Sequence, residues 1–264
     1  MTTDLSNIHI ATIIACRLKS TRLPRKALLK IGELPSVEYC IKSALQFQNV
    51  RTTVLATSTV PEDAVLEKHT YSPEVKFFKG DPEDVMQRYV DVVNKYNIDV
   101  FVRVTADMPF LSDEILQFLL RSHFESKADY TIGTKAAIGT NLEIINASAL
   151  IRAKSFFPNA DYSEYMSYYF TNNPEYFKLN RVELPEELVR DYRLTLDYEE
   201  DLVLFNIIEG HLSKNKLAPS FKNIFAFLDN NPEIAKINQS LLVKYTGDPT
   251  LVETLNRVTK IPKP

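Results

Sequence analysis

The most informative segment of the chain reads Ile8-His9-Ile10-Ala11-Thr12-Ile13-Ile14-Ala15 and continues as Cys16-Arg17-Leu18-Lys19-Ser20-Thr21-Arg22-Leu23-Pro24-Arg25-Lys26. Its first part is nearly all apolar and rich in β-branched side chains, which is typical of a strand buried on both faces of a parallel sheet. The continuation carries five cations, and ligands of such sheets bind beyond the carboxyl ends of the strands. Guanidinium groups bind phosphate oxygens in pairs and lysine adds a point charge, so Arg17, Arg22 and Lys26 suit a triphosphate. A solvated basic loop is the alternative, but the position after a buried first strand favours a binding loop.

Strand and helix patterns alternate through the first half of the chain. In chain order they predict a helix over 36–47, strands over 52–57 and 75–78, a helix over 82–96, a strand over 100–105 and a helix over 112–124. Pro82 fits a first helical turn, Asp84 favours the positive end of the helix dipole, and Ser112 is a typical N-cap. This alternation predicts an α/β fold with a mostly parallel, nucleotide-binding sheet flanked by helices.

The pattern changes after residue 130 into shorter, mixed pieces. These pieces include the aromatic stretch 162–170, whose composition suits a core, a subunit interface or a substrate wall. The elements predicted after them are a strand over 193–196, a helix from 199 to about 210, and helical patches over 221–228 and 249–258. We therefore divide the chain into a domain over 1–214 and a helical C-terminal appendage over 215–264.

Composition narrows the class of protein. The chain has 264 residues and a net charge of −3, so it can bury a large core and lacks the overall charge of a non-specific nucleic-acid binder. Cys16 and Cys40 stand in no metal-binding or redox spacing, which predicts reduced thiols. The N-terminus has no signal-peptide pattern and no segment has the length of a membrane span, so we expect a cytoplasmic protein without membrane insertion.

Two aspartates each follow a predicted core strand: Asp107 comes after 100–105 and Asp197 after 193–196. Magnesium is commonly bound by one or two carboxylates, with water and substrate phosphate completing its coordination, so this pair is a candidate metal site. The alternative is local: Asp107 would cap a turn before Met108-Pro109, and Asp197 would cap the helix that begins near Glu199.

Several motifs together resemble the CMP-sugar cytidylyltransferases, the family of acylneuraminate and 3-deoxy-octulosonate activating enzymes, nearest to the spore coat polysaccharide biosynthesis protein F branch. Residues 15–26 are similar to its Ala-Arg and Ser-x-Arg-Leu-Pro-Gly-Lys signature, and residues 103–110 to Arg-x-Thr-Gly-Asp-Cys-Pro-Leu. Residues 193–202 resemble Arg-Leu-Thr-Val-Asp-Thr-Pro-Glu-Asp-Leu, and shorter similarities occur at 56–58 and 80–89. The matches run in the family's order from about residue 8 to about residue 210. They imply a Rossmann-like sheet of the nucleotide-diphospho-sugar transferase type.

The resemblance also implies roles for individual residues. The residues implied to act in catalysis are Arg17, Arg22, Lys26 and Asp107. The three cations among them would hold the β- and γ-phosphates. Those implied to bind the nucleotide are Ala15, Arg17, Ser20, Arg22, Lys26, Thr57, Ser58, Asp81, Arg88 and Asp107. Those implied to bind the acceptor are Arg103, Glu164, Tyr165 and Arg193. Asp107 and Asp197 would hold Mg²⁺, and an excursion over about 135–185 would form a homodimer contact.

The sequence departs from the family pattern at several positions. Cys16 is inserted between Ala15 and Arg17, and Arg25 replaces a glycine, which adds a charge and removes backbone freedom. Ala106 and Tyr198 replace a glycine and a threonine beside the two aspartates. Tyr165 stands where a histidine is frequent, which implies a changed acceptor pocket.

The resemblance implies a cytidylyltransferase that transfers CMP from CTP to an anionic sugar, such as a nonulosonic or other sugar acid, with release of pyrophosphate. Such a reaction would serve surface polysaccharide or glycan biosynthesis. One alternative is a sugar-1-phosphate nucleotidyltransferase using another nucleotide, although no glycine precedes Gly32 where those enzymes carry a glycine-rich loop. A glycosyltransferase is disfavoured because no Asp-x-Asp motif is present. A non-catalytic nucleotide-binding member of the fold is the last alternative.

Overall fold

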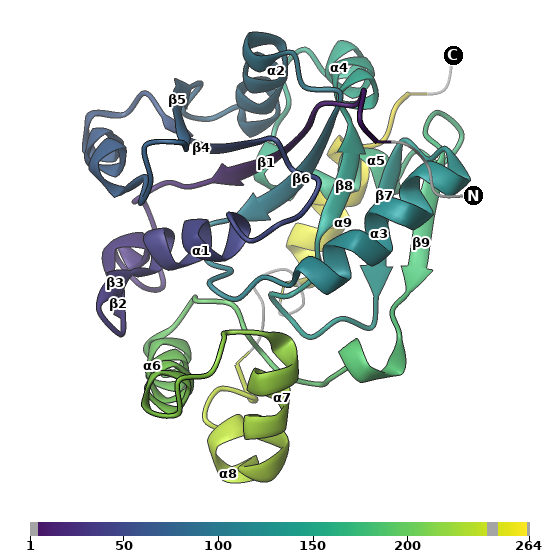
Figure 1. The fold of residues 1–264 in the computed structure, drawn as a ribbon. Helices are drawn as coiled ribbons and strands as arrows, with labels where there is room; N and C mark the ends of the chain where they lie inside the picture. Colours follow the sequence, from purple (N-terminus) through teal and green to yellow (C-terminus); the bar gives the residue numbers. More distant parts are fainter. Residues whose placement is uncertain (1–4, 242–247, 263–264) are drawn as a thin grey trace.

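The computed structural model describes residues 5–241 and 248–262. A central sheet of seven strands runs through it in the order β5-β4-β1-β6-β8-β7-β9 (Figure 1). Its strands are β1 (Ile10–Ala15), β4 (Thr52–Ser58), β5 (Lys76–Gly80), β6 (Val100–Thr105), β7 (Tyr130–Thr134), β8 (Glu143–Asn146) and β9 (Leu179–Glu183). A separate two-stranded ribbon pairs β2 (Lys30–Ile31) with β3 (Leu34–Pro35).

The sheet is parallel except at one strand. β1 pairs in parallel with β4 and β6, β4 with β5, and β7 with β9, whereas β8 runs antiparallel to both of its neighbours. The register sets Ala15 of β1 opposite Thr105 of β6. The loop after β1 and the residues after β6 therefore leave the sheet side by side, and the predicted mostly parallel α/β fold is confirmed.

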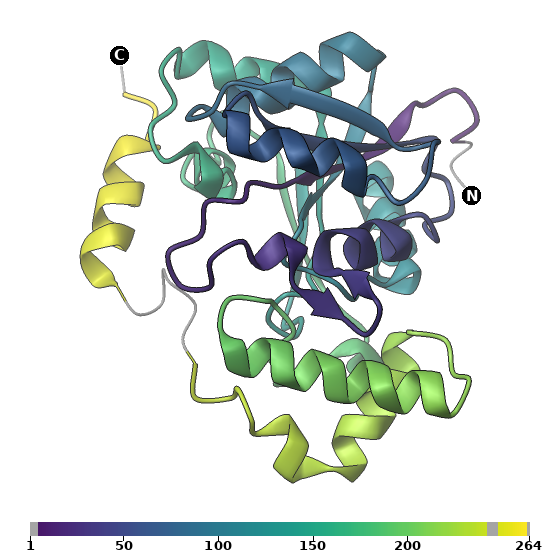
Figure 2. The same cartoon turned by 90° about the vertical axis from the view of Figure 1, so that its left-hand side faces the viewer.

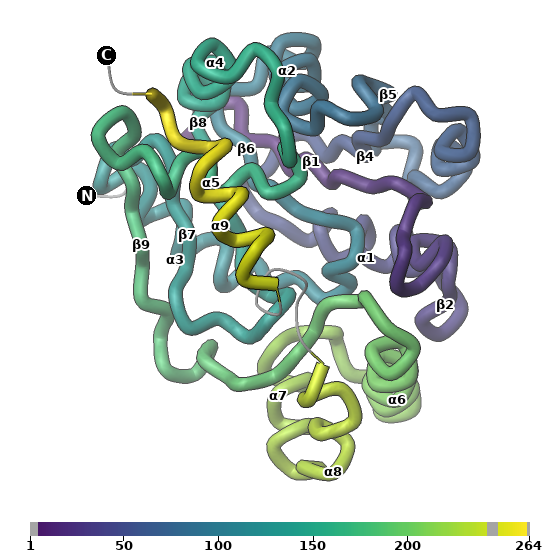
Figure 3. Tube along the Cα trace, turned by 180° about the vertical axis from the view of Figure 1, so that it is seen from behind, coloured from purple at the N-terminus to yellow at the C-terminus, as the bar shows by residue number. Residues whose placement is uncertain are grey.

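Helices cover both faces and one end of the sheet (Figures 1 and 3). α1 (Ser36–Ala44) and α3 (Asp113–Ser126) lie on one face. The other face carries α2 (Val85–Tyr96), α4 (Ala147–Phe156), α5 (Ser167–Thr171) and α9 (Pro249–Val258). α6 (Glu199–Lys214), α7 (Phe221–Asn230) and α8 (Pro232–Ala235) group at the end where the parallel strands terminate, apart from α9 (Figure 2). Single 3-10 turns lie at Lys26–Leu28, Ser163–Tyr165 and Glu186–Leu188, and a longer 3-10 segment spans Pro61–His69.

Alternating side chains of β6 show how the two faces are filled. Val100, Val102 and Val104 join the core beneath α1 and α3, while Phe101 joins the core beneath α2 and α4. This two-sided burial explains why the segment is almost wholly apolar in sequence. The alternation leaves Arg103 on the same face as Phe101, at the end of the strand nearest the site.

Most elements lie where the sequence predicts them, with two corrections. The helix predicted from residue 82 begins at Val85, because Asp84 is its N-cap and accepts a hydrogen bond from the Gln87 backbone N–H at 2.8 Å. The strand predicted over 193–196 is wrong: only Arg193 makes a bridge, to Ile138, and the rest of the segment is extended without ladder partners.

The C-terminal segment packs on the rest of the chain. Phe221, Ile224, Phe225 and Leu228 of α7 belong to the same apolar cluster as β6 and α3. The division at residue 214 stays a prediction, as does the excursion over 135–185, which contains β8 and β9. Within the described ranges, no helix is long and apolar enough to cross a membrane.

Candidate active site

Two neighbouring cavities open at the carboxyl ends of β1, β4 and β6. The first has a volume of about 180 Å³. Its lining residues are Ala15, Cys16, Arg17, Lys19, Lys26, Ala27, Val85, Arg88, Arg103, Thr105, Ala106, Asp107 and Glu164. The second, of about 530 Å³, is lined by Arg17, Leu18, Lys19, Arg25, Ser58, Val60, Glu62, Asp63, Val65 and Glu83. Arg17 and Lys19 border both, so the basic loop forms the wall between two compartments of one site.

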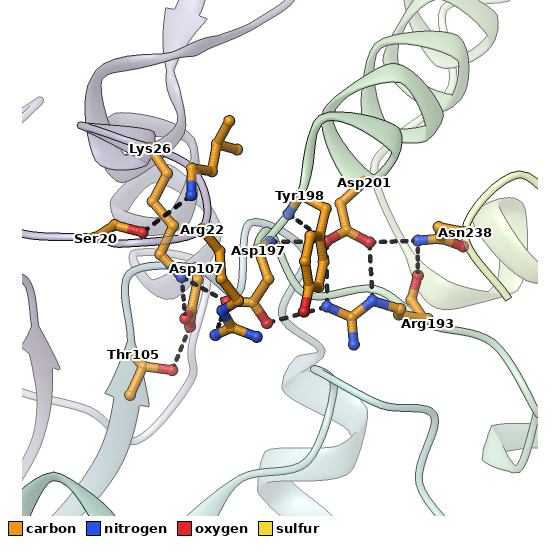
Figure 4. Close-up of polar contacts among 11 residues, drawn as sticks. Ser20, Arg22, Lys26, Thr105, Asp107, Arg193, Asp197, Tyr198, Asp201 and Asn238 are labelled. Carbon is orange, nitrogen blue, oxygen red and sulfur yellow. Dashed lines mark hydrogen bonds and ion pairs between the residues drawn. The ribbon is translucent and has the colours of Figure 1, made fainter. Parts of the chain in front are cut away.

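The two predicted metal ligands meet at the ammonium of Lys26 (Figure 4). Lys26 Nζ lies 2.7 Å from Asp107 Oδ2 and 2.9 Å from Asp197 Oδ1. The backbone also joins the two segments, because Leu196 N–H donates to the Asp107 carbonyl at 2.8 Å. Neither carboxylate has the purely local capping role that was the alternative.

Charge pairing dominates the ionisation of this group. Burial alone would raise the pKa of Asp107, but Lys26 and a 2.6 Å hydrogen bond from Thr105 Oγ1 outweigh it and hold that pKa below its usual value. Burial would likewise lower the pKa of Lys26, and the two carboxylates raise it. Both side chains are therefore charged near neutrality.

The same geometry tests whether a metal fits. A cation already bridges the two carboxylates, so the point between them favours positive charge. Among the described residues, no three His, Cys, Asp or Glu side chains cluster into a protein-only metal cage. Two carboxylates are the donor set expected for Mg²⁺ that takes its other ligands from water and substrate phosphate. The residues present fit that ion.

Arg17 and Arg88 place unpaired positive charge at the first cavity. Arg17 Nη1 donates to the Pro82 carbonyl at 2.6 Å, and Arg88 Nε donates to the Asp81 carbonyl at 3.1 Å. Neither forms an ion pair with a residue in the described ranges, and Arg88 is only 1% exposed. Burial and then the neighbouring Arg17 lower the pKa of Arg88. A half-buried and a buried cation without carboxylate partners are the protein half of an anion-binding site.

Arg22 faces the aspartates rather than a cavity. Its Nη2 donates to Asp197 Oδ1 at 2.7 Å, and its guanidinium lies 5.2 Å from the centre of the Tyr198 ring. Tyr198, in place of the family's threonine, therefore supports the arginine through a cation–π contact.

Arg25 occupies the backbone conformation that its family glycine would favour. Its φ is 53° and its ψ is 30°, in the left-handed region. The loop geometry is thus kept at the cost of strain for a residue with a Cβ atom, and the side chain lines the second cavity.

Arg103 reaches the first cavity from the opposite wall. Its Nη1 donates to Glu143 Oε1 at 2.7 Å and its Nη2 to the Glu164 carbonyl at 2.8 Å. Burial would lower the pKa of Arg103, but Glu143, Tyr89 and Tyr130 together outweigh burial and raise it. Arg103 and Glu164 are thus brought together at the wall of the cavity, and their acceptor-binding role stays a prediction.

Other predicted site residues lie elsewhere or act on the backbone. Ser20 Oγ accepts from Leu23 N–H at 3.4 Å within the loop. Asp81 accepts hydrogen bonds from the Glu83 and Asp84 N–H groups at 2.8 and 2.7 Å. The bond from the Asp84 N–H is the largest cause of the lowered pKa of Asp81. Thr57 is buried, and neither it nor Tyr165 lines either cavity.

Arg193 contacts Asp197 and lies outside both cavity linings. It is 3% exposed, lines neither cavity and binds Asp197 and Asp201. The contacts show that it supports Asp197, and its acceptor-binding role stays a prediction.

Sequence reasoning missed three residues that hold the site together. Buried Asp63 accepts from Leu18 N–H at 2.8 Å and from the Ser58 hydroxyl, and so ties the basic loop to the end of β4. Asp201 and Asn238 lie behind Asp197. The motif over 193–202 contained Asp201 and could have suggested it, whereas Asn238 and Asp63 lie in no motif.

Both cysteines are free and buried. Burial, then Asp63, raises the pKa of the Cys16 thiol, which agrees with a packing role at the strand end and disfavours a nucleophile.

The comparisons with known proteins agree with this geometry. Residues 11–253 match the family model described as cytidylyltransferase. The chain is 32% identical over 234 residues to the spore coat polysaccharide biosynthesis protein SpsF of Bacillus subtilis, covering 86% of this chain and 96% of that protein. It is 31% identical over 112 residues to a 3-deoxy-manno-octulosonate cytidylyltransferase of Chlorobium chlorochromatii, which covers 42% of this chain and 44% of that one.

A solved cytidylyltransferase from Leptospira borgpetersenii superposes with a TM-score of 0.77 at 26% identity and covers 90% of this chain and 99% of that one. The resemblance seen in the basic loop and the two aspartate motifs is therefore confirmed over most of the length. The chain is a nucleotidyltransferase that belongs to the cytidylyltransferase family.

Proposed function

We propose that the protein transfers CMP from CTP to an anionic sugar, a sugar acid, and releases pyrophosphate with the help of Mg²⁺. One observation carries the proposal: Arg17 and Arg88 line the first cavity without carboxylate partners, and Asp107, which lines it too, shares the Lys26 ammonium with Asp197 just behind. Such a cavity offers positive charge for a triphosphate and negative charge for its metal.

In the proposed reaction a hydroxyl oxygen of the sugar forms a bond to the α-phosphorus of CTP. The bond from that phosphorus to the bridging oxygen breaks, pyrophosphate leaves, and the hydroxyl proton passes to solvent. Arg17, Arg22, Lys26 and Arg88 hold the phosphates, for which Arg22 and Lys26 exchange their aspartate partners for phosphate oxygens. Bound Mg²⁺, held by Asp107 and Asp197, supplies charge neutralisation at the phosphates. The protein acts by positioning and electrostatics, without a covalent intermediate.

An anionic acceptor suits the charges around the first cavity. Lys19 lines it and forms no ion pair in the described part of the chain, so one cation remains for the acceptor once Arg17 and Arg88 hold the phosphates. Arg103 and the Glu164 segment form the wall at which we place the sugar. The names of the relatives, which concern 3-deoxy-manno-octulosonate and spore coat polysaccharide, support an acidic sugar and a role in polysaccharide biosynthesis.

The proposal includes a homodimer in the cytoplasm. Ile151, Phe156 and Tyr162, within the segment over 135–185, expose large apolar side chains that a second copy would cover. Two free, buried cysteines fit a reducing compartment.

The test is pyrophosphate release from CTP, ATP, GTP and UTP with Mg²⁺ and a panel of sugar acids and sugar phosphates. Asp107→Asn removes one carboxylate charge beside Lys26, and Glu125→Gln, on the exposed side of α3, is the matched control. We expect release only with CTP and a sugar acid, unchanged in Glu125→Gln and reduced at least 100-fold in Asp107→Asn, because one metal ligand is lost.

Release with another nucleotide and a sugar phosphate would instead establish the sugar-1-phosphate alternative. CTP binding without turnover on any acceptor, and without a difference between the two variants, would indicate a non-catalytic binder.

A further inference from the structure

The carboxylate of Asp201 is the centre of a buried cluster behind Asp197, which we call the Asp201 cluster (Arg193, Asp201 and Asn238). Asp201 Oδ1 accepts from Arg193 Nε at 2.9 Å and from Asn238 Nδ2 at 2.7 Å. Its Oδ2 accepts from the Asp197 N–H at 2.8 Å, the Tyr198 N–H at 2.9 Å and Arg193 Nη2 at 3.2 Å (Figure 4). Five donors converge on two oxygens, so both oxygens of Asp201 accept from the residues around it. The backbone of Asp197 is therefore fixed from behind.

The cluster also sets the orientation of the Asp197 side chain. Arg193 Nη2 donates to Asp197 Oδ2 at 3.0 Å, while Asp197 Oδ1 faces Arg22 and Lys26. One oxygen is clamped by the cluster and the other is turned toward the site. Arg193 is thus the link between Asp201 and Asp197.

Asn238 brings the C-terminal segment into this arrangement. It follows α8, it is 0% exposed, and besides Asp201 its Nδ2 donates to the Arg193 carbonyl at 3.0 Å. We propose that Asn238, through Asp201 and Arg193, positions Asp197 for metal binding, so that the C-terminal segment is a working part of the nucleotidyltransferase site. The proposal rests on the proposed function insofar as Asp197 is the metal ligand.

A second buried asparagine, Asn173, also holds the C-terminal segment but has no hydrogen bond to the Asp201 cluster or to Asp197 in the described part of the chain. Asn173, also 0% exposed, donates through Nδ2 to the Tyr169 and Thr259 carbonyls at 2.8 and 2.7 Å. Its Oδ1 accepts from the Ile261 N–H at 2.8 Å. Asn173 thereby fastens the end of the chain to α5 and contacts no site residue, which makes it the matched control for Asn238.

The test compares Asn238→Leu with Asn173→Leu in the full chain. Leucine keeps the approximate volume of the side chain and removes both donated hydrogen bonds. Mn²⁺ affinity is measured by electron paramagnetic resonance with saturating CTP, and urea unfolding reports stability. We expect Asn238→Leu to weaken Mn²⁺ binding about 10-fold, the lower end of the effect of losing a direct partner of a metal ligand, because Asn238 acts on Asp197 through Asp201 and Arg193. Asn173→Leu should lower the urea midpoint and leave the Mn²⁺ affinity within about twofold of wild type.

Equal losses of Mn²⁺ affinity in the two variants, or no loss in Asn238→Leu, would overturn the proposal. If Asn238→Leu does not fold, Asn238→Ser and Asn173→Ser give the same comparison with a smaller perturbation, and Asn238→Ser, which keeps one hydroxyl donor, should show a smaller loss.

Failure of the proposed function would look different. Wild-type protein would then bind neither CTP nor Mn²⁺, and crystal structures of the two leucine variants would decide the positioning claim. The Asp197 carboxylate should leave Lys26 and Arg22 only in Asn238→Leu, and an unmoved Asp197 would contradict the inference.

Discussion

Lys26 is the cation that neutralises the two carboxylates of the site. Its ammonium bridges Asp107 and Asp197, and its side chain is 17% exposed. Two carboxylates this close repel each other. In the protein without ligand, the Lys26 ammonium lies between them, where the metal is proposed to bind, and offsets that repulsion. Lys26 thus stabilises the folded protein without ligand and, in the proposed function, binds the triphosphate.

We predict that Lys26→Met lowers the free energy of unfolding at pH 7 by about 2 kcal/mol, because Asp107 and Asp197 lose their shared partner. The pKa of Asp107 is depressed in the folded protein, so its contribution is present above its unfolded value of about 3.9 and is lost as pH falls through the lower folded value. The pKa of Lys26 is raised, so its contribution is present below about 10.4 and is lost as pH rises through the higher folded value. Urea unfolding at pH 7 and pH 3 should show a difference from wild type that shrinks at pH 3.

Lys135→Met is the control for this prediction. It removes an ion pair with Glu183 in which both side chains are more than half exposed, 64% and 67%, and should have little effect. A difference between Lys26→Met and wild type that stays constant between the two pH values would show that charge is not its source.

At the scale of elements, a strand is predicted correctly from the sequence when neighbouring strands pair with it along its length. The segment over 100–105 is predicted correctly because both of its faces are buried and each face selects apolar residues. The segment over 193–196 is equally apolar, yet its N–H groups go to separate partners, Leu194 to Ile138 and Leu196 to Asp107. A sequence pattern reports burial, and it does not report whether neighbouring backbone forms a ladder.

The start of α2 follows the same reasoning. Pro82 and Asp84 both suit a helix start, and tertiary contacts decide between them: Lys154 pairs with Asp84, while the Pro82 carbonyl binds Arg17. Of the site, the basic loop and the two aspartates were predictable because they lie in motifs. Asp63 and Asn238 were not, because their partners are 45 and 37 residues away in the chain, at Leu18 and Asp201.

Loss of the α2 cap should affect the site as well as stability. Asp84→Ala removes the hydrogen bond to Gln87 N–H and the partner of Lys154, so we expect a loss of about 1–2 kcal/mol in the free energy of unfolding. Because Arg88 reaches the cavity from the first turns of this helix, the KM for CTP should rise severalfold. Urea unfolding and pyrophosphate release measure the two effects.

Ser220→Ala is the matched cap variant, since Ser220 accepts from Asn223 N–H at the start of α7. It should cost a similar stability and leave the KM for CTP unchanged. An unchanged KM in Asp84→Ala would show that the start of α2 does not control the position of Arg88.

At the scale of the whole molecule, the C-terminal segment and the sheet share one interior. α7 contributes four aromatic and aliphatic side chains to the cluster beneath α1 and α3, and Asn238 enters the Asp201 cluster. α9 lies on the far face, where Asn172 donates to Thr259 Oγ1 at 2.8 Å. Two separate attachments therefore hold the segment, one at the end of the sheet where the parallel strands terminate and one on the face that carries α9 (Figures 2 and 3).

Two truncations should separate these attachments. Ending the chain after Lys214 removes α7 and Asn238, exposes the apolar cluster and leaves Asp201 without one of its donors, so we expect an insoluble or unfolded product. Ending it after Leu241 keeps α7 and Asn238 and removes α9 with the buried Ile261, so it should give a folded protein that unfolds at lower urea concentration. Circular dichroism and urea unfolding distinguish the outcomes. A stable, cooperatively unfolding 1–214 fragment would establish the domain division at 214 and contradict the expectation of one folding unit.

The charge arrangement at Lys26 also dictates when the site can form during synthesis. Asp107 lies 81 residues after Lys26, and Asp197 lies 171 residues after it. A chain emerging from the ribosome can thus join the basic loop to its first carboxylate while the second is still unmade. Asn238 emerges later still, so the complete constellation must wait for most of the polypeptide. If translation stops early, Lys26 has one acidic partner instead of two. The complete nucleotide site would form only near the end of translation.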